Sequence, residues 1–74
     1  MDIDNLVHMA NRIGDFFQAM PEPQQAQLEL AQHIRKFWEP RMRNALNAHL
    51  ENTKAEDLKP FVRSALMTNK AVWL

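Results

Sequence analysis

Apolar residues recur every three or four positions along most of the chain, the spacing that places them on one face of an α-helix. We predict four helices from these stripes, at residues 5–19, 24–38, 41–50 and about 58–67. No stretch alternates apolar and polar residues between turn dipeptides, so a sheet is not expected. The pattern predicts an all-α protein: a small antiparallel bundle of three to four short helices, in a single domain spanning residues 1–74.

Prolines mark the borders between the expected helices. Pro21 and Pro23 end the first helix, because the residue before a proline is disfavoured in the α conformation. Pro40 lacks the backbone N–H donor, and its ring clashes with the preceding helical turn. It therefore either opens a separate third helix or kinks one continuous helix, and the sequence is compatible with both.

Three further positions carry local signals. Asp4 and Asp57 are predicted N-caps of the first and last helices, the latter with a proline in its first turn. Gly14 lies inside the first helix, where it costs about 1 kcal/mol relative to alanine. It is either a tolerated defect or a place where another backbone comes close. The apolar tail with Trp73 is either a flap that closes the core or a hook for a partner.

Residues 33–43 are the most unusual stretch, since two adjacent aromatic residues stand among four permanent cations and one anion. Phe37 is predicted to share an apolar face with Leu30 and Ile34, and Trp38 widens that face. Trp38 is either a core residue or, with the arginines, an anchor for another protein, because tryptophan and arginine are enriched at binding hot spots. The predicted partner-binding residues are His33, Arg35, Lys36, Trp38, Pro40, Arg41 and Arg43.

Size and charge narrow the functional classes. A core of 74 residues without disulfides or a metal rarely supplies more than about 3–5 kcal/mol, so association with a partner would stabilise the chain. The absence of cysteine suits a reducing compartment. Nine cations balance nine anions, which argues against attraction to nucleic acid or an anionic membrane as the overall design.

The charges are nevertheless unevenly distributed. Residues 1–22 hold four acids and one cation, whereas residues 33–43 hold four cations and one acid. This polarity either orients the domain on a partner or pairs its own helices. No apolar run is long enough to span a bilayer, and the N-terminal region has acids where a secretory signal has cations, so a cytoplasmic location is expected.

The residues give little support for catalysis. His8, His33 and His49 fall on three different predicted helices without an i, i+4 pair, so no metal site is expected. Ser64 has no neighbouring histidine, and no glycine-rich loop is present to hold phosphate. The basic, aromatic stretch has no second basic element for nucleic acid. We expect no catalytic, cofactor-binding or metal-binding residues.

Two segments and a shorter match near the end carry a family resemblance. They read Leu6-Val7-x-Met9-Ala10-Asn11-x-Ile13-x-x-Phe16-Phe17, His33-Ile34-Arg35-Lys36-Phe37-Trp38-x-Pro40-Arg41-Met42-Arg43, and Leu58 with Ala65-Leu66. In these residues the chain resembles the delta subunit of cytoplasmic, NAD-dependent, molybdenum-containing formate dehydrogenases. The resemblance covers about residues 6–66 and implies nothing for Trp73. Residues 52–57 lack the glycine that this family often carries there.

The resemblance implies a small non-catalytic subunit of a multisubunit enzyme. In that family the large subunit holds the molybdenum cofactor and iron–sulfur clusters and oxidises formate. The expected partners are this large catalytic subunit and other subunits of the complex, which the chain would bind and stabilise. The alternatives are a transient assembly factor for insertion or retention of the molybdenum cofactor, and a homo-oligomeric adaptor that acts on its own.

Overall fold

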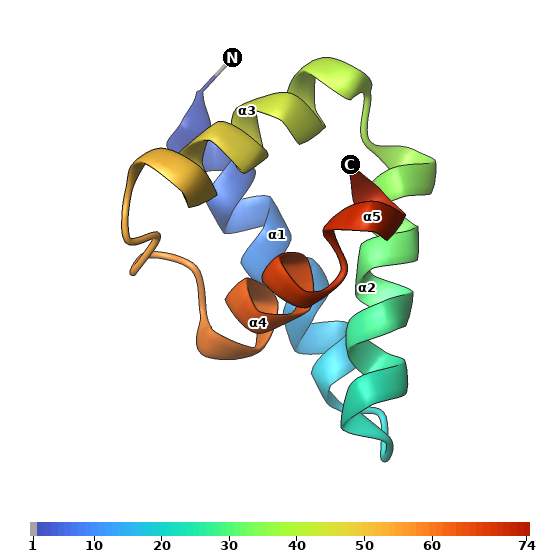
Figure 1. Cartoon of the computed structure of the whole chain (residues 1–74). Helices are drawn as coiled ribbons and strands as arrows, with labels where there is room; N and C mark the ends of the chain where they lie inside the picture. Colours follow the sequence, from blue (N-terminus) through green and yellow to red (C-terminus); the bar gives the residue numbers. More distant parts are fainter. Residues whose placement is uncertain (1) are drawn as a thin grey trace.

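The computed structural model describes residues 2–74, and this part of the chain forms five helices and no strand (Figure 1). The helices are α1 (Ile3–Gln18), α2 (Pro23–Phe37), α3 (Pro40–Asn52), α4 (Pro60–Thr68) and α5 (Lys70–Trp73). The predicted all-α bundle is therefore confirmed. The fifth helix was not expected, and it is formed by the apolar tail, which folds back onto the rest of the protein.

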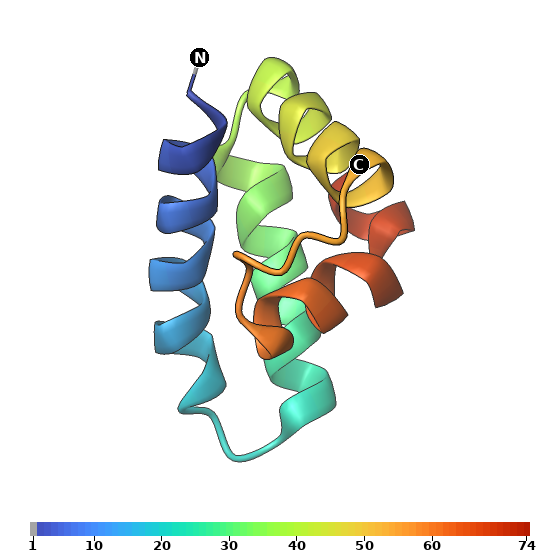
Figure 2. The same cartoon turned by 90° about the vertical axis from the view of Figure 1, so that its left-hand side faces the viewer.

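α2 is the central element of the bundle. It runs antiparallel to α1, and it also contacts α4 and α5 (Figure 2). α3 contacts α1 at one end of the α1–α2 pair, the end that contains the start of α1 and the end of α2. The largest fully buried side chains come from four of the five helices: Leu30, Ile34, Leu46, Val62, Leu66 and Trp73.

Prolines begin three of the helices. Pro23, Pro40 and Pro60 stand at the first helical position, where a missing N–H leaves no hydrogen bond unmade. Trp38 and Glu39 between α2 and α3 have extended backbone dihedral angles (φ −92°, ψ 138° and φ −69°, ψ 156°). α2 and α3 are therefore separate helices and not one kinked helix.

The two predicted N-caps are corrected. Asp2, not Asp4, caps α1, because its Oδ1 accepts a hydrogen bond from the backbone N–H of Asp4 at 3.0 Å. Asp4 lies in the first turn, where its charge favours the positive end of the helix dipole. Lys59, not Asp57, precedes α4, and the Asp57 carboxylate instead lies 2.8 Å from Nε2 of His49.

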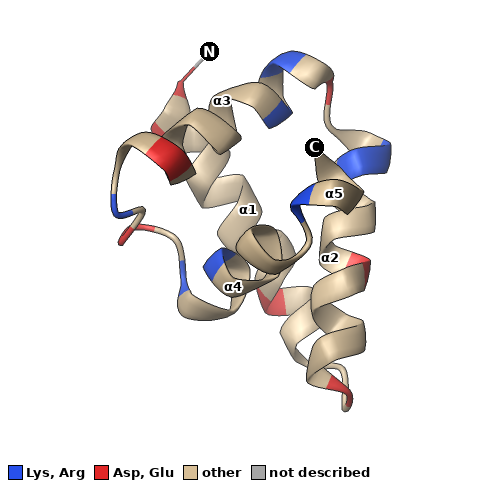
Figure 3. Ribbon diagram, in the orientation of Figure 1, with Lys and Arg blue, Asp and Glu red and all other residues tan. Residues whose placement is uncertain are grey.

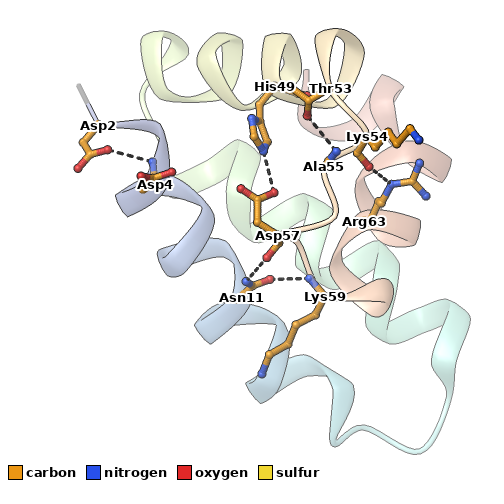
Figure 4. Close-up of polar contacts among 10 residues, drawn as sticks. All are labelled: Asp2, Asp4, Asn11, His49, Thr53, Lys54, Ala55, Asp57, Lys59 and Arg63. Atoms are coloured by element: carbon orange, nitrogen blue, oxygen red, sulfur yellow. Dashed lines mark hydrogen bonds and ion pairs between the residues drawn. The ribbon is translucent and has the colours of Figure 1, made fainter.

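The connection between α3 and α4 is fastened to α1 by Asn11, and also by the ion pair between Lys59 and Asp15. Nδ2 of Asn11 donates to the carbonyl oxygen of Asp57 at 3.0 Å, and its Oδ1 accepts from the backbone N–H of Lys59 at 2.9 Å (Figure 4). Within the same connection, Thr53 Oγ1 accepts from the N–H of Ala55, which has a positive φ of 49°. These contacts fix the start of α4 against α1.

Gly14 lies where α1 and α4 approach each other. It is buried, and a Cβ at this position would collide with Cγ2 of Val62. Neither alternative, a tolerated defect or the approach of another backbone, describes this contact, because the close neighbour is a side chain of α4. Valine is stiff about χ1, so it has little freedom to move aside.

Candidate partner-binding surface

The inner side of residues 33–43 is part of the core. Trp38 is 5% exposed and packs in the main hydrophobic cluster, so its side chain is not available as a surface anchor. This corrects the anchor prediction in favour of the alternative, a core residue. The physical reason is that Trp38 follows Leu30 and Ile34 at four-residue spacing, and its backbone N–H still donates to the Ile34 carbonyl, so its side chain continues the core-facing side of α2.

Phe37 faces solvent, although it was predicted to face the core. It is 64% exposed, although the apolar stripe had placed it inside with Leu30 and Ile34. Positions 37 and 38 both follow Ile34 at helical spacing, and the structure buries the tryptophan. The core-facing stripe of α2 therefore runs through Leu30, Ile34 and Trp38.

Two of the predicted partner-binding arginines bind the C-terminal segment of their own chain. Nη1 of Arg35 donates to the Leu74 backbone oxygen at 3.3 Å, and Nη1 of Arg43 donates to the Trp73 carbonyl at 3.1 Å. Arg43 is only 9% exposed, and within residues 2–74 its Nε has no hydrogen-bond partner. Arg43 is a buried structural residue, which corrects its predicted place on a partner surface.

The C-terminal tail closes the core. Trp73 is fully buried, and its Nε1 donates to the carbonyl oxygen of Leu66 at 2.8 Å. The tail was predicted to be either a flap that closes the core or a hook for a partner, and the structure shows the flap. The indole is buried and its only polar atom is hydrogen-bonded inside the protein, so it is not free to bind a partner.

A row of exposed or half-buried rings lies on the outer side of residues 33–43 and continues onto α1. From α1 to α2, the ring centroids of Phe16 and Phe17 are 5.2 Å apart, those of Phe17 and His33 5.7 Å, and those of His33 and Phe37 4.6 Å. Phe16 is 74% exposed, more than any other large hydrophobic side chain within residues 2–74. We call these four residues the aromatic strip.

Lysine and arginine side chains are found on the stretch that contributes to the aromatic strip. Nζ of Lys36 lies 5.5 Å from the ring centroid of Phe37. Lys36, Arg41 and Arg35 are exposed, and none forms an ion pair within residues 2–74. Figure 3 shows basic residues gathered where α2 gives way to α3 and at the start of α5. The acidic N-terminal region therefore does not neutralise this basic stretch, and Lys36 and Arg41 remain available to carboxylates of a partner.

The structure places the predicted residues in two groups. His33 is part of the strip and Lys36 lies over its Phe37 ring, and Pro40 and Arg41 are exposed at the start of α3. The sequence reasoning did not assign a binding role to Phe16 or Phe17. A signal was present, because adjacent helical residues point about 100° apart, so two neighbouring phenylalanines do not both face one core.

Other site chemistry is not assembled in the described part of the chain. Among residues 2–74, no three histidine, cysteine, aspartate or glutamate side chains gather closely enough to hold a metal ion. None of the five helices has both the length and the apolar character needed to cross a membrane.

Comparison with known proteins gives one match to a protein family. The family model described as NADH-dependent formate dehydrogenase delta subunit FdsD matches residues 5–66. This range includes most of α1 and all of α2 and α3 and ends within α4 at Leu66, so it contains the whole aromatic strip and the basic stretch. Searches of curated proteins and of solved structures give no match.

Proposed function

The chain belongs to the family of NADH-dependent formate dehydrogenase delta subunits, and we propose that it is a non-catalytic accessory subunit. It binds and stabilises a cytoplasmic, NAD-dependent, molybdenum-containing formate dehydrogenase complex. The observation that carries this proposal is the outer side of residues 33–43, where Nζ of Lys36 lies 5.5 Å from the centroid of the exposed Phe37 ring. Lys36 and the exposed Arg41 form no ion pair within residues 2–74. Exposed aromatic and cationic side chains of this kind are typical of binding hot spots.

The proposed partner is the large catalytic subunit, with other subunits of the complex as further neighbours. The proposed docking residues are six exposed or half-buried residues of the stretch: His33, Arg35, Lys36, Phe37, Pro40 and Arg41. Trp38 and Arg43 support this surface from inside the bundle. A chain of 74 residues with a core of limited stability gains further stability when a large partner binds its folded form.

The test is to purify the enzyme complex from cells that express the chain and from cells that lack it. We expect the chain to be present at one copy per catalytic subunit, and the complex without it to dissociate or lose activity faster on storage. A wild-type chain that fails to co-purify would contradict the proposal, and so would a pure chain that oxidises formate by itself.

The same purification distinguishes the alternative, a transient assembly factor for molybdenum cofactor insertion or retention. That role predicts less than one copy in the mature enzyme. It also predicts a molybdenum deficit when the chain is absent during synthesis, with no loss of stability in complexes that did receive the metal. Metal analysis and subunit stoichiometry on the same sample separate the two functions.

A further inference from the structure

We infer that the aromatic strip seats a segment of the large catalytic subunit whose apolar side chains are bordered by carboxylates. This inference rests on the proposed function, from which it takes the identity of the partner. It adds α1 to the docking surface and states the chemistry that the partner must present there.

The strip is a continuous surface built from two helices. Its rings lie in a row from Phe16 and Phe17 near the end of α1 to His33 and Phe37 in the second half of α2. Successive centroids are 4.6–5.7 Å apart, the range in which aromatic rings attract each other. Because the rings already hold one another, a partner that covers them has less side-chain freedom to immobilise.

The exposure of the strip is not explained by the fold itself. Phe16 and Phe37 are the two most exposed large hydrophobic side chains within residues 2–74, and they lie at the two ends of the same row of rings. Single exposed apolar residues are normal, whereas a contiguous apolar patch marks an interaction site. The strip is therefore the surface of this protein that a partner would bury.

The charges at the borders of the strip identify the partner as acidic. Lys36 lies over Phe37, and Arg12 precedes Phe16 by one helical turn, the spacing at which helix side chains are neighbours. Neither cation has an ion pair within residues 2–74. The nearby Asp15 is neutralised by Lys59, whose Nζ is 2.8 Å from its carboxylate.

Two acids, Glu29 and Glu39, are close in sequence to the strip, and neither forms an ion pair with its cations within residues 2–74. Glu29 precedes His33 by one turn, and its carboxylate accepts a hydrogen bond from Gln25 at 3.1 Å. Arg12 near one end of the strip and Lys36 near the other are therefore without an ion-pair partner within residues 2–74. Carboxylates on the covering segment would complement both.

The same charges argue against a second copy of this chain as the occupant. A two-fold dimer places the same surface on both sides of the interface. Pairing strip with strip would bring Arg12 and Lys36 close to the same cations of the second copy, and such like-charge contacts cost several kcal/mol. A partner with acidic borders avoids this repulsion.

The test measures how tightly the full chain binds to the formate dehydrogenase complex. The complex is purified from cells that do not express this chain. Phe16→Ala and Phe37→Ala are each expected to weaken binding by about 30-fold or more, the loss typical of a truncated hot-spot residue. Met67→Ala is the matched control, because Met67 is an exposed apolar residue of α4 outside the strip. It should bind within about twofold of the wild-type chain.

Charge reversal tests the chemistry of the partner. Lys36→Glu and Arg12→Glu should each weaken binding, and added salt should weaken binding of the wild-type chain more than that of these variants. Wild-type affinity in both phenylalanine variants would overturn the inference while leaving the proposed function intact. Failure of the wild-type chain to bind the complex would contradict the proposed function itself.

Light scattering on the isolated chain completes the test. A monomer is expected at concentrations at which it binds the complex. A dimer that Phe16→Ala converts to monomer would assign the strip to a second copy and would overturn the inference.

Discussion

The two sides of α2 use different aromatic residues. The inner side presents Trp38 to the core, where Trp73 of α5 is also buried, whereas the outer side presents Phe37 and His33 to solvent. None of the four phenylalanines is buried, although both tryptophans are. In a chain this short, the core is stabilised by a few large side chains, and the rings left outside contribute their apolar area only when a partner covers them.

This contrast separates folding from binding. The inner residues should control the free energy of unfolding, and the outer residues should control the affinity for the complex. Substitutions on the two sides therefore have different expected effects, and they can be ranked by the apolar volume and packing that each one removes.

The largest effect is expected for Trp73→Ala. It removes a fully buried ring and the hydrogen bond to the Leu66 carbonyl, and such truncations cost about 3–5 kcal/mol. This is comparable with the whole stability expected of a domain this small. Urea unfolding followed by circular dichroism should show a largely unfolded chain, and a loss below about 1 kcal/mol would contradict the closed position of the tail.

A smaller effect is expected for Gly14→Ala. The new Cβ collides with Val62, and overpacking costs about 1–3 kcal/mol, which outweighs the gain in helix propensity of about 1 kcal/mol. The matched variant pair is Val62→Ala with and without Gly14→Ala. In that background the alanine at position 14 should be neutral or stabilising, and the same loss in both backgrounds would rule out the steric explanation.

The smallest effect on stability is expected for Phe16→Ala and Phe37→Ala. Both side chains are mainly exposed, and surface substitutions away from special features change stability by about 0.5 kcal/mol or less. Thermal unfolding of the isolated variants should match that of the wild-type chain. A loss above about 1.5 kcal/mol would mean that the outer rings also support the fold, and the separation of the two sides would not hold.

The helices could be predicted from the sequence because their signals are local. The periodicity and the prolines at positions 23 and 40 gave the borders of α2 and α3 within two residues at each end, but they left open whether the two helices are continuous. The choice between Asp2 and Asp4 as N-cap was wrong because both are suitable residue types at nearly the same place. Such errors reflect neighbouring solutions of similar energy.

The candidate surface was less predictable because it depends on contacts distant in the sequence. Arg43 and Arg35 reach backbone oxygens 30 and 39 residues away, and no local pattern indicates that they are engaged inside the chain. Phe37 and Trp38 follow Ile34 by three and four residues, so the helical spacing allowed either to face the core, and the packing of the bundle selects Trp38. The basic stretch was visible in the sequence, but which of its side chains face outward was not.

The placement of the tryptophans has a practical consequence for spectroscopy. The chain has two tryptophans and no tyrosine, and both indoles are buried, whereas Phe16 and Phe37 at the ends of the aromatic strip are exposed. The intrinsic fluorescence of the isolated protein therefore reports the integrity of its interior. Its emission should shift to the red when the tail opens or the chain unfolds, and contact at the row of phenylalanines should leave it nearly unchanged.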